Sequence, residues 1–365
     1  MMMNNDSMER SLFGMRWETV QYTKSEIKAA GKAIEKNDYE RISREQALEI
    51  ANNWRAAHAY PLQVFYMNAK RYSEEFSEAI VAQRLKRLDS IVGKLQRSSG
   101  MNLYKMQDLG GCRVIVKTIS EVYQVKERFL RSAARHVLER EYDYIAQPKQ
   151  SGYRSLHMVY SYKTKGGKKT YDGMFIELQI RTYPQHLWAT AVEILSLPMK
   201  TNLKAEIGDS RVLRYMELVS ALFAIEERMP LSQYVPQDAS DIVDEITTLE
   251  DTNVLDIMDA MNITLASKHT TQKSKQEAYY LLKINTAERK VYIKSFRKKD
   301  LEVAIGEYAA IEDNSDEQIN AVLVSSENIN SLRKAYPNYF ADTKKFVSAV
   351  EILLKKYFRS DISSP

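Results

Sequence analysis

The sequence predicts an α+β protein in which a mixed β-sheet is flanked by helices and is followed by a second, smaller α/β unit. Three observations support this fold class. Apolar residues recur at helical spacing in several stretches before Gly152, the pattern changes to period two after it, and helix and strand patterns alternate again beyond residue 237. At 365 residues the chain also exceeds the usual size of a single hydrophobic core, so we expect two domains.

Two helices are expected before the first strand. Ser43 and Gln46 form the pattern of a capping box, which opens a helix that runs to about His58 and is stopped by Pro61. A longer helix is expected over residues 74–98, because apolar residues recur there at helical spacing and a Ser-Ser-Gly sequence supplies its end.

The central part of the chain alternates between helix and strand patterns. A β-branched run predicts a strand over residues 112–119, and a helix is expected from about 120 to 138. Period-two alternation predicts strands over residues 153–163 and 174–182, joined by a Gly-Gly turn within a lysine cluster. A helical tract over residues 185–228 closes this half.

Prolines and polar residues mark a linker near residues 232–237, which predicts domains at 1–235 and 236–365. The elements expected in the second domain are a helical stretch at 241–261, strands at 278–284, 291–296 and 319–325, a helix at 300–311, and helices near Glu327 and Thr343.

Composition is that of an ordinary soluble protein with a mildly basic charge. Hydrophobic residues make up 44% and charged residues 28%, and the formal net charge is +5. This balance suits polyanionic partners without requiring them. The N-terminus lacks the apolar region of a signal peptide, and no stretch approaches the roughly 18 apolar residues of a membrane span, so we expect no membrane association.

The single cysteine, Cys112, excludes an internal disulfide and a cysteine-based zinc cage. A reducing compartment is therefore the natural setting, and we expect the protein in the cytoplasm. Cys112 begins a buried-looking strand without a neighbouring base, so we interpret it as a packed residue rather than a nucleophile. The sequence contains no Walker A, HExxH or G-x-S-x-G signature.

Two carboxylates form a candidate metal site. Strand alternation places Glu177, Gln179 and Arg181 on one face of the strand at 174–182, although a solvent-exposed sheet face would have the same pattern. Asp108 and two glycines precede the strand at 112–119, so Asp108 lies at a strand entrance, where a plain turn cap is the alternative. Asp108 and Glu177 are the residue types that together hold Mg²⁺.

A cationic stripe is predicted on the helix at 74–98. Lys86, Ser90, Lys94 and Arg97 follow the spacing i, i+4, i+8 and i+11, with Arg84 and Arg87 on the shoulder. Such a stripe is often a solvated surface, but beside a metal site it is suited to holding triphosphate oxygens.

The most specific stretch is residues 143–157, which read DYIAQPKQSGYRSLH. Together with residues 107–113 and 177–182, it resembles the motif set of the RelA/SpoT synthetases in order and approximate spacing, and the resemblance covers about residues 40–230. It implies a nucleotidyltransferase-like synthetase domain and an ATP-dependent pyrophosphokinase that uses Mg²⁺ and transfers pyrophosphate to a ribose hydroxyl.

The resemblance also implies roles for individual residues. Arg84 and Arg113 match the arginines that sandwich the adenine of ATP, an arrangement suited to guanidinium planes. The residues that match phosphate-binding positions are Lys86, Ser90, Lys94 and Lys149. Asp108 and Glu177 match the family's carboxylates that bind metal and activate the acceptor hydroxyl. Tyr153 matches the tyrosine on which the acceptor base stacks, with His157 and Gln179 nearby.

In the C-terminal part, Tyr336 and Tyr339 flank a Pro-Asn turn. Composition alone favours a packed tyrosine pair, but the arrangement resembles the fused toxin–antitoxin synthetases of the CapRel type. This implies a pseudo-zinc-finger-like domain whose two tyrosines occupy the adenine site, a tRNA 3′ end as the acceptor, and release from autoinhibition by a phage structural (capsid-type) protein. The hydrolase His-Asp pair of the long bifunctional relatives has no counterpart in the first 70 residues.

Two lysine groups are compatible with a tRNA acceptor, although lysines on such surfaces commonly serve only solubility. They are Lys163, Lys165, Lys168 and Lys169 in the expected hairpin, and Lys24, Lys28, Lys32 and Lys36 along an N-terminal helix. An alarmone synthetase acting on GDP or GTP stays open as an alternative. So does a non-catalytic RNA-binding module, although two carboxylates where phosphates must lie argue against it. The oligomeric state is not indicated by the sequence.

Overall fold

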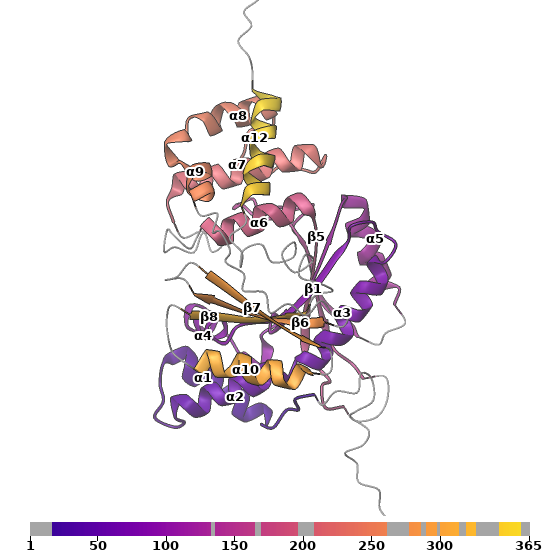
Figure 1. The fold of residues 1–365 in the computed structure, drawn as a ribbon, viewed down its shortest axis with the longest axis vertical. Helices are drawn as coiled ribbons and strands as arrows, with labels where there is room; N and C mark the ends of the chain where they lie inside the picture. The colour runs from indigo at the N-terminus through magenta and orange to yellow at the C-terminus, as the bar shows by residue number, and fades with distance from the viewer. Residues whose placement is uncertain are drawn as a thin grey trace, which may run out of the picture.

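The computed structural model describes residues 17–132, 136–164, 169–195, 208–260, 277–285, 290–297, 300–313, 319–325 and 343–358. A mixed eight-stranded sheet lies at its centre, in the order β3-β4-β5-β2-β1-β8-β6-β7, with helices on both faces (Figure 1). The predicted mixed sheet flanked by helices is therefore confirmed.

The first five strands form the part of the sheet that carries the candidate site residues. Their bounds are β1 Ile80–Leu85, β2 Gly110–Val116, β3 Val137–Asp143, β4 Leu156–Ser161 and β5 Phe175–Thr182. β2 and β5 run parallel, while β1 pairs antiparallel with β2, and β4 pairs antiparallel with both β3 and β5. The strands predicted at 153–163 and 174–182 are confirmed as β4 and β5.

The last three strands extend the same sheet. β6 Glu277–Asn285, β7 Lys290–Arg297 and β8 Ile319–Ser325 agree with the predicted strands. β8 pairs antiparallel with β1, so that Arg84 lies opposite Val324. The sheet thus continues from the first predicted domain into the second, and the domain boundary itself stays a prediction.

Helices on one face of the sheet build the larger core. They are α1 Lys24–Lys36, α2 Arg44–Ala57, α3 Ala59–Ser73, α4 Leu88–Arg97, α5 Ile119–Leu130 and α10 Leu301–Asp313. Ser43 caps α2, because its hydroxyl accepts a hydrogen bond from the backbone N–H of Gln46. In Figure 1, α10 lies beside α1 and α2, and Arg55 Nη1 of α2 donates to the Tyr308 hydroxyl of α10 at 2.7 Å. One core therefore joins the N-terminal helices to α10.

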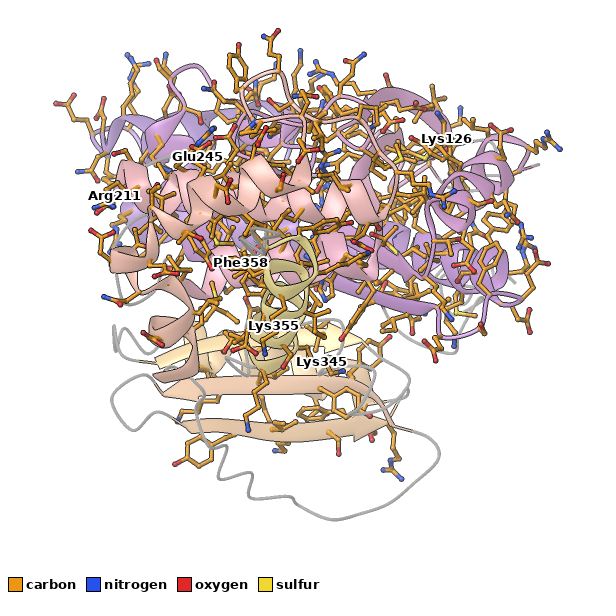
Figure 2. The ribbon with its side chains drawn as sticks, turned by 90° about the horizontal axis from the view of Figure 1, so that it is seen from above. Lys126, Arg211, Glu245, Lys345, Lys355 and Phe358 are labelled. Carbon is orange, nitrogen blue, oxygen red and sulfur yellow. The ribbon has the colours of Figure 1, made fainter. Side chains whose placement is uncertain are left out.

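A second core lies on the other side of the sheet. Its helices are α6 Tyr183–Leu195, α7 Ser210–Glu226, α8 Ala239–Thr247, α9 Val254–Ala260 and α12 Lys344–Tyr357. Seen from above in Figure 2, α12, which carries Lys345 and Lys355, lies against the other helices of this layer. Lys356 and the Tyr357 hydroxyl both contact Glu226 of α7 at 2.6 Å, which fixes the end of α12.

Three helix predictions are wrong. The helix expected over 74–98 is instead the strand β1 followed by α4, because Glu78 adopts a positive φ of 68° and β1 pairs on both sides. The helix expected over 120–138 ends at Leu130, and β3 follows. Pro61 does not stop a helix but lies in the first turn of α3, where its missing N–H costs no hydrogen bond. The helix expected near Glu327 lies outside the described residues.

No helix among these residues combines the length and the apolar character that crossing a bilayer requires.

Gly152 allows the loop before β4 to dock on α7, which leads to a prediction. Its φ is +84°, and a Cβ there would lie 2.8 Å from the Ser220 Cβ and 3.2 Å from the Glu217 Cα. Gly100 also has a positive φ but has nothing within 4 Å. Gly152→Ala is expected to lower the free energy of unfolding by about 1–3 kcal/mol more than the control Gly100→Ala. The control introduces only the strain of a positive φ and no steric overlap. Urea unfolding measures both, and equal losses would contradict a steric role for Gly152.

Candidate active site

One face of the sheet gathers most of the predicted site residues. In the parallel register Gly111 lies opposite Glu177 and Arg113 opposite Gln179, while His157 pairs with Gln179 from the other side. The Glu177 side chain is only 18% exposed. A solvent-exposed sheet face, the alternative that the sequence left open, is therefore excluded for this strand.

Asp108 is held by two lysines. Its Oδ2 accepts hydrogen bonds from Lys86 Nζ and Lys94 Nζ, both at 2.9 Å. Burial alone would raise the pKa of Asp108, but the two lysines outweigh it and the pKa is lowered. Burial also lowers the pKa of Lys86, despite the attraction of Asp108. The site thus holds two cations within reach of one carboxylate, although Lys86 belongs to the loop before α4 and not to a long helix.

Glu177 accepts a hydrogen bond at each oxygen. His157 Nδ1 donates to Oε1 at 3.0 Å, and Gln179 Nε2 donates to Oε2 at 2.8 Å. Burial alone would raise the pKa of Glu177, but His157, Gln179 and Lys94 outweigh it and lower the pKa to about 2. Glu177 is therefore ionised and oriented at neutral pH.

The chain of hydrogen bonds continues in both directions from Glu177. On one side, His157 Nε2 and the Tyr153 hydroxyl lie 2.8 Å apart. On the other side, Gln179 Oε1 accepts from Arg181 Nη2 at 2.8 Å. Burial alone would lower the pKa of His157, but Tyr153 and Glu177 outweigh it and the pKa is raised. Hydrogen bonds therefore join Tyr153, His157, Glu177 and Gln179 into one connected unit, and their acceptor-side roles stay a prediction.

The remaining predicted ATP residues lie on three elements. Arg84 of β1 is opposite Gly111, and Arg113 lies two residues further along β2, so the two guanidinium groups are diagonal neighbours on one face. Ser90 lies one turn before Lys94 on α4, hence on the same side of the helix. These positions are compatible with the predicted adenine and phosphate contacts, which stay predictions.

Lys149 lies beside two tyrosine rings, and its predicted phosphate contact stays a prediction. Its Nζ is 4.7 Å from the centroid of the Tyr144 ring and 5.6 Å from that of Tyr153. The Tyr144 ring in turn meets His157 and Tyr153 edge to face. Lys149 was predicted with the ATP phosphates, and this position places its charge next to the ring on which the acceptor base is predicted to stack.

Asp108 has more free capacity to bind a magnesium ion than Glu177. Asp108 Oδ1 is buried and has no hydrogen-bond partner among the described residues, so its lone pairs are available. Each oxygen of Glu177 already accepts one hydrogen bond. Within the described part of the chain no group of three or more His, Cys, Asp or Glu side chains comes together. Mg²⁺ bound here would thus take ligands from Asp108, with Glu177 beside it, and the rest from phosphate and water.

Some predicted residues lie outside the described part of the chain, namely Tyr336, Tyr339, Lys165 and Lys168. Two described residues were missing from the predicted site. Arg181 was predicted to lie on the polar face of β5, and this shared face with Gln179 could have indicated that it belongs to the site. Tyr144 stood inside the most specific motif, and its spacing from Tyr142 was the signal.

The Glu177–His157 contact predicts how His157 titrates. With Glu177 present, its pKa lies above the ordinary 6.5. Glu177→Gln removes the partner charge but leaves the burial and Tyr153, so the pKa of His157 is expected to fall. The protein has five histidines, few enough to assign the resonance with His157→Gln and follow it by NMR against pH. An unchanged pKa in Glu177→Gln would show that the carboxylate does not control this histidine.

Among solved structures, this chain is similar to small alarmone synthetase 1 of Bacillus subtilis bound to its product pppGpp. The identity is 25%, the TM-score is 0.39, and the match covers 47% of this chain and 88% of that chain. It is also similar to small alarmone synthetase 2 of the same organism, with 22% identity, a TM-score of 0.40 and coverage of 49% and 92%.

Two sequence comparisons define the family. The profile described as "Region found in RelA / SpoT proteins" matches residues 83–195, which begin within β1 and include β2, β3, β4 and β5. The "GTP pyrophosphokinase YwaC" of Bacillus subtilis (strain 168) is 28% identical over 131 residues, covering 34% of this chain and 61% of that protein. The "GTP pyrophosphokinase YjbM" of the same strain is 33% identical over 154 residues, covering 41% of this chain and 69% of that protein. The chain therefore belongs to the RelA/SpoT family of pyrophosphokinases, enzymes that transfer pyrophosphate.

Proposed function

We propose that this enzyme transfers the pyrophosphate of ATP to the ribose 3′ hydroxyl at the 3′ end of tRNA and thereby inhibits translation. The observation that carries the proposal is the hydrogen-bonded chain from Glu177 through His157 to Tyr153. A base stacked on Tyr153 would bring its own ribose next to an ionised carboxylate, which is the geometry that general-base activation of a hydroxyl requires.

In the proposed reaction the 3′ oxygen attacks the β-phosphorus of ATP. A bond forms between these atoms, the bond from the β-phosphorus to the oxygen bridging to the α-phosphorus breaks, and AMP leaves. Glu177 accepts the hydroxyl proton, while His157 and Gln179 keep the carboxylate in place. Lys86 and Lys94 neutralise phosphate oxygens, since positioning and charge neutralisation dominate this type of transfer. When bound at Asp108, Mg²⁺ would supply further neutralisation of the triphosphate.

A tRNA acceptor is supported by the surface next to the donor residues. Lys24, Lys28, Lys32 and Lys36 are all exposed on α1, and α1 packs against α4, the helix that bears Lys94. Lysines spaced by four residues present their charges on one side of a helix, where they would contact phosphates of a long polyanion.

The second candidate is an alarmone synthetase that uses GDP or GTP as the acceptor. It is favoured by the names of the sequence relatives, which are GTP pyrophosphokinases, and by the product pppGpp in one similar structure. A guanine base would stack on Tyr153 in the same way as adenine, so the residues described above suit both acceptors. A non-catalytic RNA-binding module suits them poorly, because Asp108 and Glu177 would repel phosphates.

We further propose that the C-terminal part restrains the enzyme, that Tyr336 and Tyr339 enter the adenine site, and that a phage structural protein releases them. The supporting observation is the pairing of β8 with β1, which ties the C-terminal strands to the strand that carries Arg84. Removing the C-terminal part would expose the edge of β1 and part of the larger core. Tests of restraint therefore use the full chain.

Transfer assays with γ- and β-labelled ATP test the acceptor. The full chain and its Tyr336→Ala variant are incubated with total tRNA in one tube and with GDP or GTP in another. We expect label on tRNA, and a loss of at least about 100-fold in Glu177→Gln, because the general base is gone. The matched control Glu127→Gln changes a half-exposed glutamate of α5 and should stay fully active. Label on guanosine nucleotides alone would establish the second candidate instead.

Restraint by the C-terminal part predicts a growth phenotype. Expression of Tyr336→Ala in the full chain should stop growth, and adding Glu177→Gln should restore it, because toxicity then depends on transfer. Tyr234 is an exposed tyrosine, 54% accessible, and Tyr234→Ala is the control, which should be harmless. Normal growth with an active, folded Tyr336→Ala protein would exclude this form of autoinhibition.

A further inference from the structure

The edge of the sheet beyond the acceptor site carries a row of aromatic and basic residues. Tyr153, Tyr144 and Tyr142, together with Lys149 and Arg140, are called the tyrosine track below. We propose that the tyrosine track binds the nucleotides that precede the terminal one in a single-stranded RNA 3′ end. This inference rests on the proposed function and deepens it, because it makes the length of the acceptor part of its recognition.

The three rings form a continuous series. The Tyr153 and Tyr144 centroids are 6.0 Å apart and meet edge to face. Tyr144 and Tyr142 are 5.7 Å apart with only 2° between their planes, a parallel, offset arrangement. The series begins at the ring that hydrogen-bonds His157 and ends on β3, the outermost strand of the sheet. It therefore leads away from the reacting end of the acceptor toward open surface.

A β-bulge turns part of the track to the active-site face. Leu138 pairs with Tyr160 on the core side, but the register shifts before Arg140, which pairs with Val159. Since Val159 also pairs with Glu177, Arg140 points to the same face as that carboxylate, and so does Tyr142, which pairs with His157. Without the extra residue, simple alternation would send Arg140 and Tyr142 to the core side.

The exposure and charge of the track suit a polyanion with stacking bases. Tyr142 and Tyr144 are both partly exposed, and Lys149 and Arg140 are exposed. Arg140 Nη1 also donates to the Tyr142 hydroxyl at 3.2 Å, and Lys149 lies over the Tyr144 ring. Proteins that bind single-stranded nucleic acids commonly combine aromatic rings, on which bases stack, with cationic side chains near the phosphates.

The acceptor class follows from the length of this row. A mononucleotide whose base stacks on Tyr153 has no further base to place on Tyr144 or Tyr142. A strand of three or more nucleotides has such bases, and its phosphates pass Lys149 and Arg140. A packed edge with no ligand would explain the parallel pair Tyr142 and Tyr144, but it does not explain why a bulge turns Arg140 and Tyr142 to the sheet face that carries Glu177.

Equilibrium binding tests the tyrosine track without requiring turnover. A 5′-fluorescein RNA hexamer ending in CCA is titrated by anisotropy, and AMP is the mononucleotide competitor. Both are measured with Mg²⁺ and saturating α,β-methylene ATP, which keeps the donor site filled, in the full chain and in Tyr336→Ala. The double variant Tyr142→Leu/Tyr144→Leu is compared with Tyr142→Phe/Tyr144→Phe, which keeps both rings, and with the exposed control Tyr234→Leu.

The double leucine variant should weaken hexamer binding about ten-fold or more, because each stacked base contributes roughly 1–3 kcal/mol, while AMP binding falls much less. The phenylalanine pair and the control should bind as the parent does. Equal hexamer affinity in the leucine variant, or an equal loss for AMP and hexamer, would overturn the proposal. Absence of hexamer binding by the parent in both backgrounds would overturn it too.

Failure of the proposed function gives a different result. If label goes only to guanosine nucleotides while the hexamer still depends on the two tyrosines, the tyrosine track binds RNA and the proposed acceptor is wrong. If label goes to tRNA but the hexamer affinity does not depend on Tyr142 and Tyr144, the proposed acceptor is supported and the proposed role of the tyrosine track is wrong.

Discussion

The parallel pairing of β2 with β5 is the constraint on which the site depends. It sets Gly111 opposite Glu177 and leaves Asp108 just before the entry of β2, so both carboxylates reach the same end of the sheet. A Cβ at Gly110 would lie 2.7 Å from the Ile176 Cδ1, and glycine therefore leaves room for this side chain on β5. A slip of one residue would turn Glu177 into the core.

The two carboxylates are kept ionised by different partners, and this difference fits the different roles proposed for them. Asp108 is paired with two lysine ammonium groups, which suits its proposed place next to a triphosphate. Glu177 is hydrogen-bonded by a titratable histidine and by an amide, which suits its proposed exchange of a proton with the acceptor hydroxyl. Burial works against ionisation in both cases and makes each partner indispensable.

The sequence predicted those parts of the fold that local pattern determines. Alternation predicted β4 and β5, and the motifs that contain His157 and Glu177 placed both residues in one site. The strand β1 was missed because its apolar residues also fit helical spacing, and only pairing with β2 and β8 decides between the two. The bulge in β3 could not be predicted either, since its register depends on β4, a long-range partner.

The shared sheet also gives the C-terminal part a physical route to the donor side. The backbone of β1 is bonded to β2 along one edge and to β8 along the other, so the position of Arg84 depends on both neighbours. In the proposed regulation, a ligand that shifted β8 would therefore act on the strand that carries an adenine contact, in addition to any movement of Tyr336. Because Tyr279 of β6 and Tyr308 of α10 belong to the larger core, such a shift would also have to overcome the packing of that core. In this proposal the restraint would be part of the fold itself, and only a ligand with markedly different affinity for the two arrangements would release it.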